Sequence, residues 1–179
     1  MTSEAELVAT EGGLEPATAG WFVVNVRDAC WWRNESFGVV CAFEGEEAEF
    51  EHLGINLHVL QPGQPSCMYH EESEQEAFLV LHGECLLLVE GEKRRLRPWD
   101  FFHCPPGTEH VFVGAGDGAC VLLMTGTRRP GSTLRYPVSD LARRRGAGVD
   151  KETTDGREAY AAFPRSERGR LDVPGLPWA

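Results

Sequence analysis

Two short apolar runs joined by tight turns constrain the fold of this chain most strongly. Residues 77–82 read AFLVLH, and after Gly83 residues 85–90 read CLLLVE. A further turn at Glu90-Gly91 leads into EKRRLR at 92–97. Each run is shorter than an ordinary helix and ends at a glycine turn, which is typical of neighbouring antiparallel strands. The segment therefore predicts a β-meander.

Other strand-like segments extend this pattern into an all-β domain. The candidates are residues 21–26, 37–43, 55–60, 100–104, 109–113 and 120–125. About eight to ten short strands separated by Gly and Pro turns are typical of a jelly roll or barrel. Both faces of CLLLV are apolar, so the outer face needs cover. We expect either the C-terminal tail or a second subunit to provide it.

The chain divides into three parts by composition. A length of 179 residues predicts one domain with additional terminal segments. Residues 1–20 carry four Glu and few large apolar groups, which predicts a flexible N-terminal arm. Residues 21–127 form the predicted barrel, and residues 128–179 a C-terminal extension packing on the barrel or on a second subunit.

The extension is expected to contain two short helices. Ser139 is a candidate N-cap for a helix that ends at Gly146, and Thr154 leads into a second helical segment. The final residues are rich in Pro and Gly, so we expect them to run over the barrel surface as irregular chain.

The net charge of −11 is unevenly distributed. Residues 1–127 hold 21 acids against 6 bases, whereas residues 128–179 hold 7 acids against 11 bases. Such an acidic body repels phosphate backbones, which argues against nucleic acid or an anionic membrane as a partner. The basic tail is expected to pack along its own acidic body or along that of a sister subunit.

The termini and the cysteines indicate the compartment. The N-terminus has no basic start and no apolar core of signal-peptide length, and no apolar run approaches about 18 residues. We therefore expect a cytoplasmic protein. The six cysteines lack any CxxC pair, which favours reduced, mostly buried thiols over disulfides or a zinc ribbon.

Four candidate metal ligands lie between the strand-like segments: His70, Glu72, Glu76 and His110. His70 and Glu72 are two apart, so on a strand they share a face, and Glu76 follows beyond a bend. Pro105-Pro106-Gly107 predicts a turn that returns His110 toward the same place. The alternative is that HEESEQE is only a solvated acidic loop, and that alternative has most weight for Glu72.

The donor types restrict the metal. Two imidazoles and one carboxylate leave open positions on a non-haem iron or a similar ion. A second carboxylate favours manganese or iron over copper, and zinc accepts the same donors. His103 either supports a ligand from behind or is structural, and His52, His58 and His82 are interpreted as structural.

Two motifs in this region resemble those of the cupin superfamily. Residues 70–83 read H-x-E-x3-E-x6-G, and residues 99–110 read W-D-x4-P-x-G-x2-H. The second is nearly complete, with Trp99 where cupins usually have glycine. The first departs at Glu72, where H-x-H is usual, and six residues instead of five separate Gly63 from His70. The resemblance covers about residues 37–125 and is closest to small single-domain bacterial cupins of the conserved-barrel type.

The resemblance implies a double-stranded β-helix, often dimeric, with one divalent ion in the barrel mouth. Carried over to this chain, the ligands are His70, Glu76 and His110, with Glu72 as a fourth. If Glu72 is instead not bound to the ion, its carboxylate lies close enough to act as a catalytic general base. The ion is iron, manganese, zinc or nickel. We expect a small-molecule ligand and a homodimer.

Two function classes stay open at this point. One is a metal-dependent enzyme acting on a small polar molecule, with oxygenase, isomerase or lyase chemistry. The other is a non-catalytic protein that binds a small molecule or holds a structural metal. Because one fold hosts many chemistries, the resemblance does not choose between them.

Overall fold

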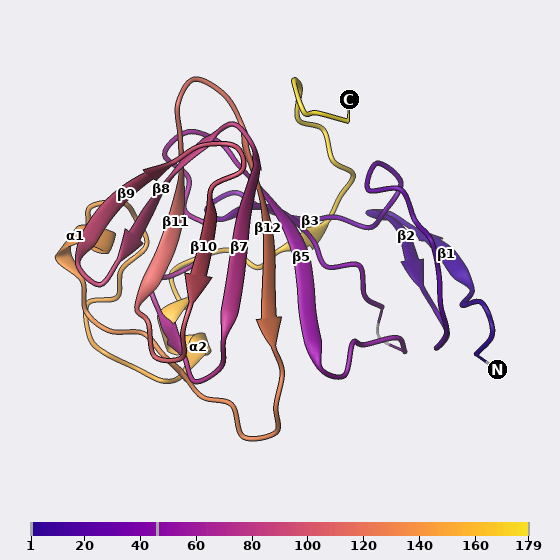
Figure 1. Ribbon diagram of the computed structural model, residues 1–179, viewed down its shortest axis with the longest axis horizontal. Coiled ribbons are helices and arrows are strands. Elements are labelled where there is room, and N and C mark those ends of the chain that lie inside the picture. Colours follow the sequence, from indigo (N-terminus) through magenta and orange to yellow (C-terminus); the bar gives the residue numbers. More distant parts are fainter. Residues whose placement is uncertain (1, 46, 179) are drawn as a thin grey trace.

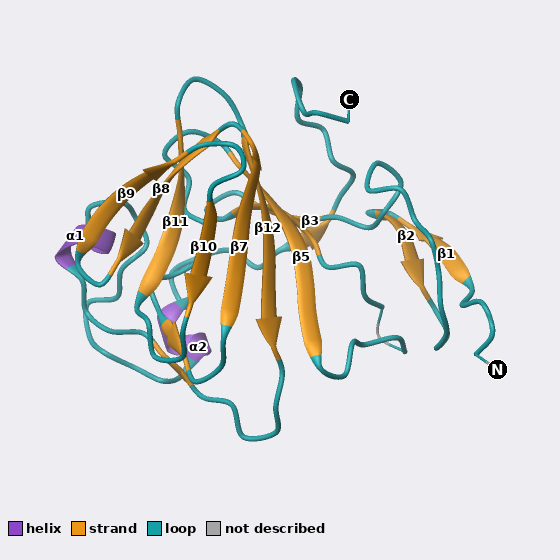
Figure 2. Ribbon diagram, in the orientation of Figure 1, coloured by secondary structure: helices purple, strands orange, loops and turns teal. Residues whose placement is uncertain are grey.

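The computed structural model describes residues 2–45 and 47–178, and most of its regular secondary structure is β-strand (Figures 1 and 2). Met1, Glu46 and Ala179 lie outside the described residues. A seven-stranded and a three-stranded antiparallel sheet pack face to face, with two further two-stranded sheets beside them. The predicted all-β jelly roll is confirmed.

Strand order shows how distant segments meet. The larger sheet runs β10 (Phe101–Cys104), β7 (Glu76–His82), β12 (Cys120–Thr127), β5 (Leu53–Leu60), β4 (Gly38–Cys41), β3 (Trp32–Asn34) and β14 (Glu167–Arg168). The smaller sheet runs β11 (His110–Ala115), β8 (Glu84–Val89) and β9 (Glu92–Leu96). The two-stranded sheets are β1 (Leu7–Thr10) with β2 (Gly13–Pro16), and β13 (Leu134–Arg135) with β6 (Glu71–Glu72).

The turn between β7 and β8 needs glycine. Gly83 has a φ of 64°, and a Cβ there would lie 2.2 Å from the Ala119 carbonyl oxygen. This turn sends β7 into the larger sheet and β8 into the smaller one, so the two apolar runs face each other across the core. The predicted strands are confirmed, but β7 and β8 belong to different sheets rather than to one meander.

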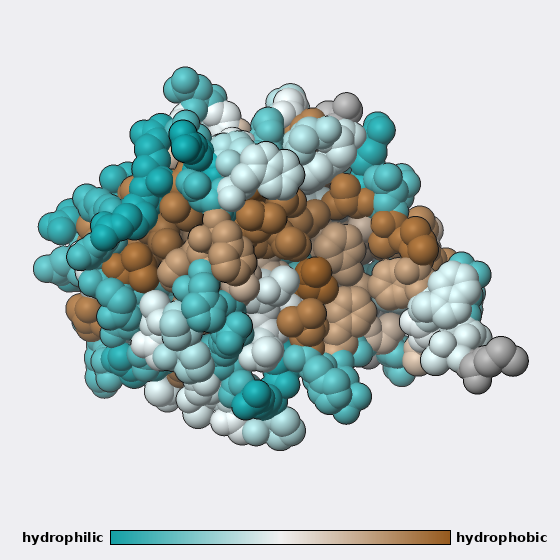
Figure 3. All heavy atoms as spheres, in the orientation of Figure 1, coloured by the Kyte–Doolittle hydropathy of each residue, from teal (hydrophilic) through white to brown (hydrophobic). Residues whose placement is uncertain are grey.

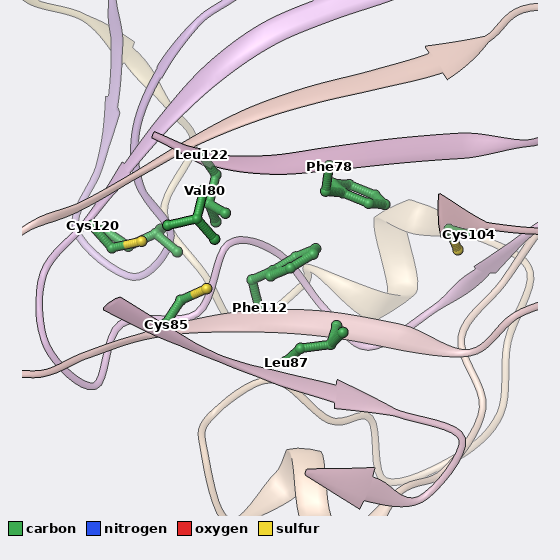
Figure 4. Packing of buried hydrophobic residues seen from close by; sticks show 9 residues of the cluster. Phe78, Val80, Cys85, Leu87, Cys104, Phe112, Cys120 and Leu122 are labelled. Carbon is green, nitrogen blue, oxygen red and sulfur yellow. The ribbon is translucent and has the colours of Figure 1, made fainter. Parts of the chain in front are cut away.

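The core between the sheets is apolar and closely packed. Figure 4 shows side chains from β7 and β12 pointing toward side chains from β8 and β11. The cluster comprises Leu60, Phe78, Val80, Cys85, Leu87, Cys104, Phe112, Cys120 and Leu122, all less than 5% exposed. All six cysteines of the chain are free thiols, and five are buried, as predicted.

The C-terminal extension covers the outer face of the smaller sheet. Leu88 and Val111 on that face pack against Ala142 and Ala147 of the extension. Ala142 lies in helix α1 (Asp140–Arg143), whose N-cap is Ser139 as predicted. Of the two expected covers for the apolar strand β8, the tail of the same chain is therefore the one observed.

The extension is also tied to the acidic body by arginines. Ion pairs join Arg128 to Glu44, Arg129 to Glu74, Arg135 to Glu71 and Glu109, and Arg168 to Glu15. The basic tail thus packs along its own acidic body, one of the two arrangements expected from the charge distribution. None of the described helices is long and apolar enough to cross a membrane.

Some local expectations are wrong. Residues 21–26 form no strand: Trp21 makes one isolated bridge to Glu4, and the segment is held by packing of Val24 and Val26 on the core. Helix α2 (Gly156–Ala159) is capped by Asp155 rather than Thr154, because the Asp155 carboxylate accepts the Arg157 N–H at 2.8 Å.

The N-terminal arm contains a hairpin that sequence analysis did not predict. Strands β1 and β2 pair through four residues each. Leu14 then bonds through its backbone to Asp28 and Cys30, which attaches the hairpin to the rest of the chain. The mobility of this arm stays a prediction.

The outer face of the larger sheet is apolar and exposed in part. Figure 3 shows hydrophobic side chains gathered across the face over β10, β7, β12 and β5. On this face Phe101 pairs with Leu79, and Leu79 pairs with Leu123. Phe101 is 64% and neighbouring Trp99 73% exposed. This row of residues is called the outer apolar row below.

Replacing Ala142 tests whether the extension is part of the folded core. Ala142→Glu places a carboxylate among the apolar side chains of Leu88, Val111 and Ala147, so the free energy of unfolding should fall by about 3 kcal/mol or more. Urea unfolding measures the loss. Ala162→Glu, at an exposed position of the same extension, should change the free energy of unfolding little. Equal stability of both variants would contradict the packing described.

Candidate metal site

The two motif histidines face each other through their backbones. His70 and His110 form an isolated antiparallel bridge, with His70 N–H donating to the His110 carbonyl at 3.2 Å and the reverse bond at 2.8 Å. Their ring centroids are 4.8 Å apart. The turn at Pro105-Pro106-Gly107 assists this pairing, because the Gly107 N–H donates to the Glu72 carbonyl at 2.7 Å. The predicted return of His110 toward His70 is confirmed.

Each imidazole is oriented by a backbone carbonyl. The Nδ1 atom of His70 lies 2.8 Å from the Met68 carbonyl oxygen, and that of His110 lies 3.0 Å from the Thr108 carbonyl oxygen. An N–H at Nδ1 satisfies each carbonyl and leaves the Nε2 lone pair free. Metal-bound histidines are generally held in this way.

Glu76 completes a three-residue group. It begins β7, and its carboxylate Oε2 lies 3.5 Å from His110 Nε2. One ligand atom each from His70, Glu76 and His110 lies within 4.8 Å of the other two. Glu76 Oε2 is buried without a hydrogen-bond partner among the described residues. Since a buried oxygen anion without a partner is costly, the donors present fit a bound cation.

The pKa values show the electrostatic state of the group. Burial raises the pKa of Glu76 to about 7, and the neighbouring Glu72 carboxylate adds to the rise while His70 opposes it. Burial lowers the pKa of His110 to about 4, with His70 contributing. Burial opposes protonation of His70, but Cys67, the Met68 carbonyl and Glu76 together raise its pKa. Because His110 is neutral at neutral pH, its contact with Glu76 is not an ion pair.

Glu72 lies beside the group without belonging to it. Its Oε1 is 3.7 Å from His70 Nε2, and its side chain is 35% exposed, against 13% for Glu76. Within the described residues, the group of converging ligand atoms contains His70, Glu76 and His110 only. The more solvated position of Glu72 leaves its predicted roles as ligand or base both open.

The segment that carries His70, directly before β6, is held by the C-terminal extension. Tyr69 N–H donates to the Ala147 carbonyl at 2.7 Å, and Met68 N–H donates to the Tyr160 hydroxyl at 3.0 Å. Next along the chain, β6 pairs with β13. One edge of this segment therefore meets His110 and the other edge meets the extension, so the site depends on both parts of the chain.

An ion cluster fixes β6 further. Arg135 on β13 lies 2.7 Å from Glu71, 2.9 Å from Glu109 and 2.8 Å from Glu152. Glu71 precedes Glu72 and Glu109 precedes His110, so one guanidinium joins the neighbours of two site residues. The bonds to Arg135 lower the pKa of Glu71.

A cavity of about 250 Å³ opens at the group. Sequence analysis missed two polar residues that line it, Asn56 and His58 of β5. Asn56 Oδ1 and His58 Nδ1 are buried without partners among the described residues. The sequence pattern that could have identified them is the alternation of Asn56 and His58 with Leu57 and Val59. On a strand this alternation puts Asn56 and His58 together on one face, which here is the inner face of the barrel. The interpretation of His58 as merely structural overlooked this.

Other histidine and cysteine neighbours have simpler positions. His103 is exposed on the face of β10 that points away from the core, so it does not support the group from behind. Cys104 is buried, and its Sγ lies 3.5 Å from His110 Nδ1. Burial raises the pKa of Cys104 to about 12, so the thiol stays protonated beside the imidazole.

Comparison with known proteins agrees with the geometry. A family model described as a cupin domain matches residues 56–126, which include His70, Glu76 and His110. The chain contains a cupin domain. No curated protein matches this sequence.

Solved cupins are similar to the chain over part of its length. A sugar phosphate isomerase of the cupin superfamily from Silicibacter pomeroyi is 29% identical with a TM-score of 0.50, over 57% of this chain and 66% of that one. A provisionally assigned sugar phosphate isomerase from Acidithiobacillus ferrooxidans is 31% identical with a TM-score of 0.45, over 47% and 55%. The chain thus spans less than two thirds of either protein's length.

A third structure supports the fold alone. The polyketide cyclase RemF from Streptomyces resistomycificus is 17% identical with a TM-score of 0.53, over 63% of this chain and 83% of that one. The match extends the jelly-roll likeness beyond the cupin segment of residues 56–126.

Metal affinity is expected to depend on pH. Below about pH 7 Glu76 is protonated, and a metal must displace that proton as well as the one on His70, so the association constant for Mn²⁺ should fall more than tenfold per pH unit as the pH drops. The raised pKa of His70 should extend the rise in affinity above pH 7. Calorimetric titration with Mn²⁺ at several pH values measures the trend. An affinity that is unchanged between about pH 6 and pH 8 would contradict the assignment.

Proposed function

We propose that this cupin holds one divalent ion through His70, Glu76 and His110 and is a metal-dependent enzyme acting on a small polar molecule. The observation that carries the proposal is the convergence of two oriented imidazoles on a buried carboxylate oxygen that has no hydrogen-bond partner among the described residues. Iron, manganese, zinc and nickel all accept these donors. Three protein ligands leave positions open, as in catalytic rather than closed structural sites.

The bound ion would polarise a substrate oxygen and stabilise negative charge that develops on it. The protein would contribute an apolar wall on one part of the site, since Phe78, Phe112 and Met124 line the same cavity. Among oxygenase, isomerase and lyase chemistry, the likeness to the Silicibacter pomeroyi protein favours isomerase chemistry.

Glu72 is proposed as the general base. Its carboxylate lies 3.7 Å from His70 Nε2, lines the cavity and is better solvated than Glu76. A carboxylate in that place can take a proton from a bound substrate and return it at a neighbouring atom, which is the proton movement an isomerisation needs. The alternative role, as a fourth ligand, differs in its effect on metal content.

Metal analysis of variants tests these roles. The protein as purified should carry about one divalent ion per chain, and His70→Ala or His110→Ala should lose most of it because the ligand set becomes incomplete. Elemental analysis after desalting measures the content. His103→Ala, an exposed histidine outside the group, is the control and should keep the wild-type content. Equal metal in all four proteins would refute the site.

Glu72→Gln separates the base from the ligand within the same experiment. As a base, Glu72 is dispensable for the ion, so metal content should persist while turnover falls. As a ligand, its replacement should lower metal affinity as well. The substrate search starts with sugars, sugar phosphates, hydroxy acids and phenols, scored by metal-dependent turnover and thermal stabilisation.

A non-catalytic binding protein is the second candidate. The unpartnered Asn56 and His58 atoms in the cavity favour a bound small molecule whether or not it reacts. Stabilisation by ligands without turnover across a broad panel, with full metal occupancy, would favour this binder over the enzyme.

A homodimer is proposed on the outer apolar row. Trp99 adopts a φ of 76°, a backbone conformation that favours glycine, yet it carries an exposed tryptophan next to exposed Phe101. Exposed apolar surface of this kind commonly marks an interface, and two-fold pairing of identical chains is the commonest assembly. A cytoplasmic location stays a prediction.

Light scattering of a charged variant tests this assembly. Wild type should be a dimer at micromolar concentration, and Phe101→Glu should shift it to monomer because a carboxylate would be buried in the interface. Val138→Glu, at an exposed apolar position in the extension, should leave the dimer intact. A monomeric wild type would refute the assembly.

A further inference from the structure

A second cavity of about 580 Å³ adjoins the metal site. The larger sheet continues through β4 and β3 to β14, so part of its inner face extends past the three-stranded sheet. Residues 157–166 of the extension cover this part. The lining residues that matter for recognition are Trp32, Phe37, Arg157, Tyr160, Phe163 and Arg165. Its volume lies within the range of small-molecule pockets, about 300–1,000 Å³.

The charge of this cavity is opposite to that of the chain. Arg157 and Arg165 line it, and no Asp or Glu does among the residues that the structure describes. Several other arginines of the extension, such as Arg128 and Arg135, are neutralised by ion pairs. Within the described part of the chain, neither the Arg157 nor the Arg165 guanidinium has an acidic partner. In a protein of net charge −11, two available guanidinium groups at one cavity favour an anion.

Its walls are aromatic and fixed in place. Phe37 contacts Tyr160 and Phe163 edge to face, with ring centroids 5.2 and 4.8 Å apart. The Tyr160 hydroxyl accepts the Met68 N–H, and Trp32 lies under the Arg168 guanidinium at 5.0 Å. A preformed aromatic wall suits a flat or apolar ligand body, because no side chain must be ordered on binding.

The two cavities share His58 and Ser66 as lining residues. His58 Nδ1 is buried without a partner among the described residues, and Ser66 Oγ contacts only the Cys67 sulfur, at 3.5 Å. Burial lowers the pKa of His58 to about 4, so its ring is neutral and offers one donor and one acceptor. A ligand that passes this wall would supply the missing hydrogen bond.

We propose that the second cavity binds a small organic anion, a carboxylate or a phosphate ester with an aromatic or apolar body, through Arg157 and Arg165. The ligand extends past His58 toward His70, Glu76 and His110, so the cavity holds one part of the substrate and the metal site acts on the other. The part of the proposal in which the ligand reaches past His58 to the metal site rests on the proposed metal function, whereas anion binding by the two arginines does not.

Calorimetry with matched probes tests the anion requirement. The probes are trans-cinnamate, its neutral analogue cinnamamide, and phenyl phosphate. At least one of the two anions should bind at least tenfold more tightly than cinnamamide, because only an anion gains from both arginines. Which anion binds more tightly distinguishes a carboxylate ligand from a phosphate ester. Equal affinity for all three probes would overturn the proposal.

Paired substitutions locate the binding. Arg157→Gln with Arg165→Gln should weaken the tighter anion at least tenfold. Arg144→Gln with Arg145→Gln removes the same charge from exposed positions of the same extension and should leave affinity within twofold of wild type. Equal loss in both double variants would show a general charge effect and would refute the cavity as the site.

His58→Phe tests the continuity of the two cavities. The replacement keeps a planar aromatic ring at this position and removes the unpartnered nitrogen, so the melting temperature should rise. Affinity for the tighter anion should fall severalfold, because the ligand loses its partner in the wall. Unchanged affinity would refute the proposal that the ligand reaches past His58. A purely structural histidine would instead lower the melting temperature when replaced.

The outcomes separate this proposal from the metal assignment. If the purified wild type contains no metal and still binds the anion through Arg157 and Arg165, the proposed metal function is refuted and the proposed anion site is supported. A wild type that holds metal but binds neither anion would refute the second cavity and keep the metal site. His110→Ala should lose metal yet retain binding through Arg157 and Arg165.

Discussion

The backbone bridge between His70 and His110 is the constraint on which the site depends. Two hydrogen bonds place the residue before β6 opposite the first residue of β11, and these segments are 40 residues apart in the chain. Because the bridge fixes both backbones, the imidazoles need only a carbonyl each to set their rotation. Glu76 then reaches them from the opposite sheet. The donor geometry is thus set mainly by main-chain pairing and only secondarily by side-chain contacts.

The C-terminal extension acts as a structural part of the domain. It covers the outer face of the smaller sheet through Ala142 and Ala147, pairs with β6 through β13, and lines the second cavity. The same segment that completes the core therefore also shapes the space beside the metal group. The cupin match of residues 56–126 contains the three converging ligands but not the arginines of the second cavity. The proposed anion recognition and the proposed metal binding accordingly depend on different parts of the sequence.

Periodicity and turn residues were sufficient to predict most strands and to bring four candidate ligands to one place, of which His70, Glu76 and His110 converge and Glu72 lies beside them. The apolar runs at β7 and β8 and the turn at Gly83 carry strong local signals. The hairpin of β1 and β2 was missed because its residues are weakly apolar and its pairing depends on contacts with Asp28 and Cys30. Asn56 and His58 were missed as cavity residues because their role follows from what lies opposite β5. The strand predicted at residues 21–26 was wrong because an apolar extended segment becomes a strand only beside another strand. Among the described residues this segment makes only the isolated bridge between Trp21 and Glu4.

The pairing of β6 with β13 links the metal group to the stability of the extension. Holding an ion requires the His70 backbone to stay paired, and that backbone is bonded on its other edge to Tyr160, Ala147 and β13. Any ligand that favours the paired arrangement also favours a docked extension, and the coupling free energy is the same in both directions. If the proposed ion is bound, local opening of residues 128–168 would favour its release, and ion binding would favour a docked extension.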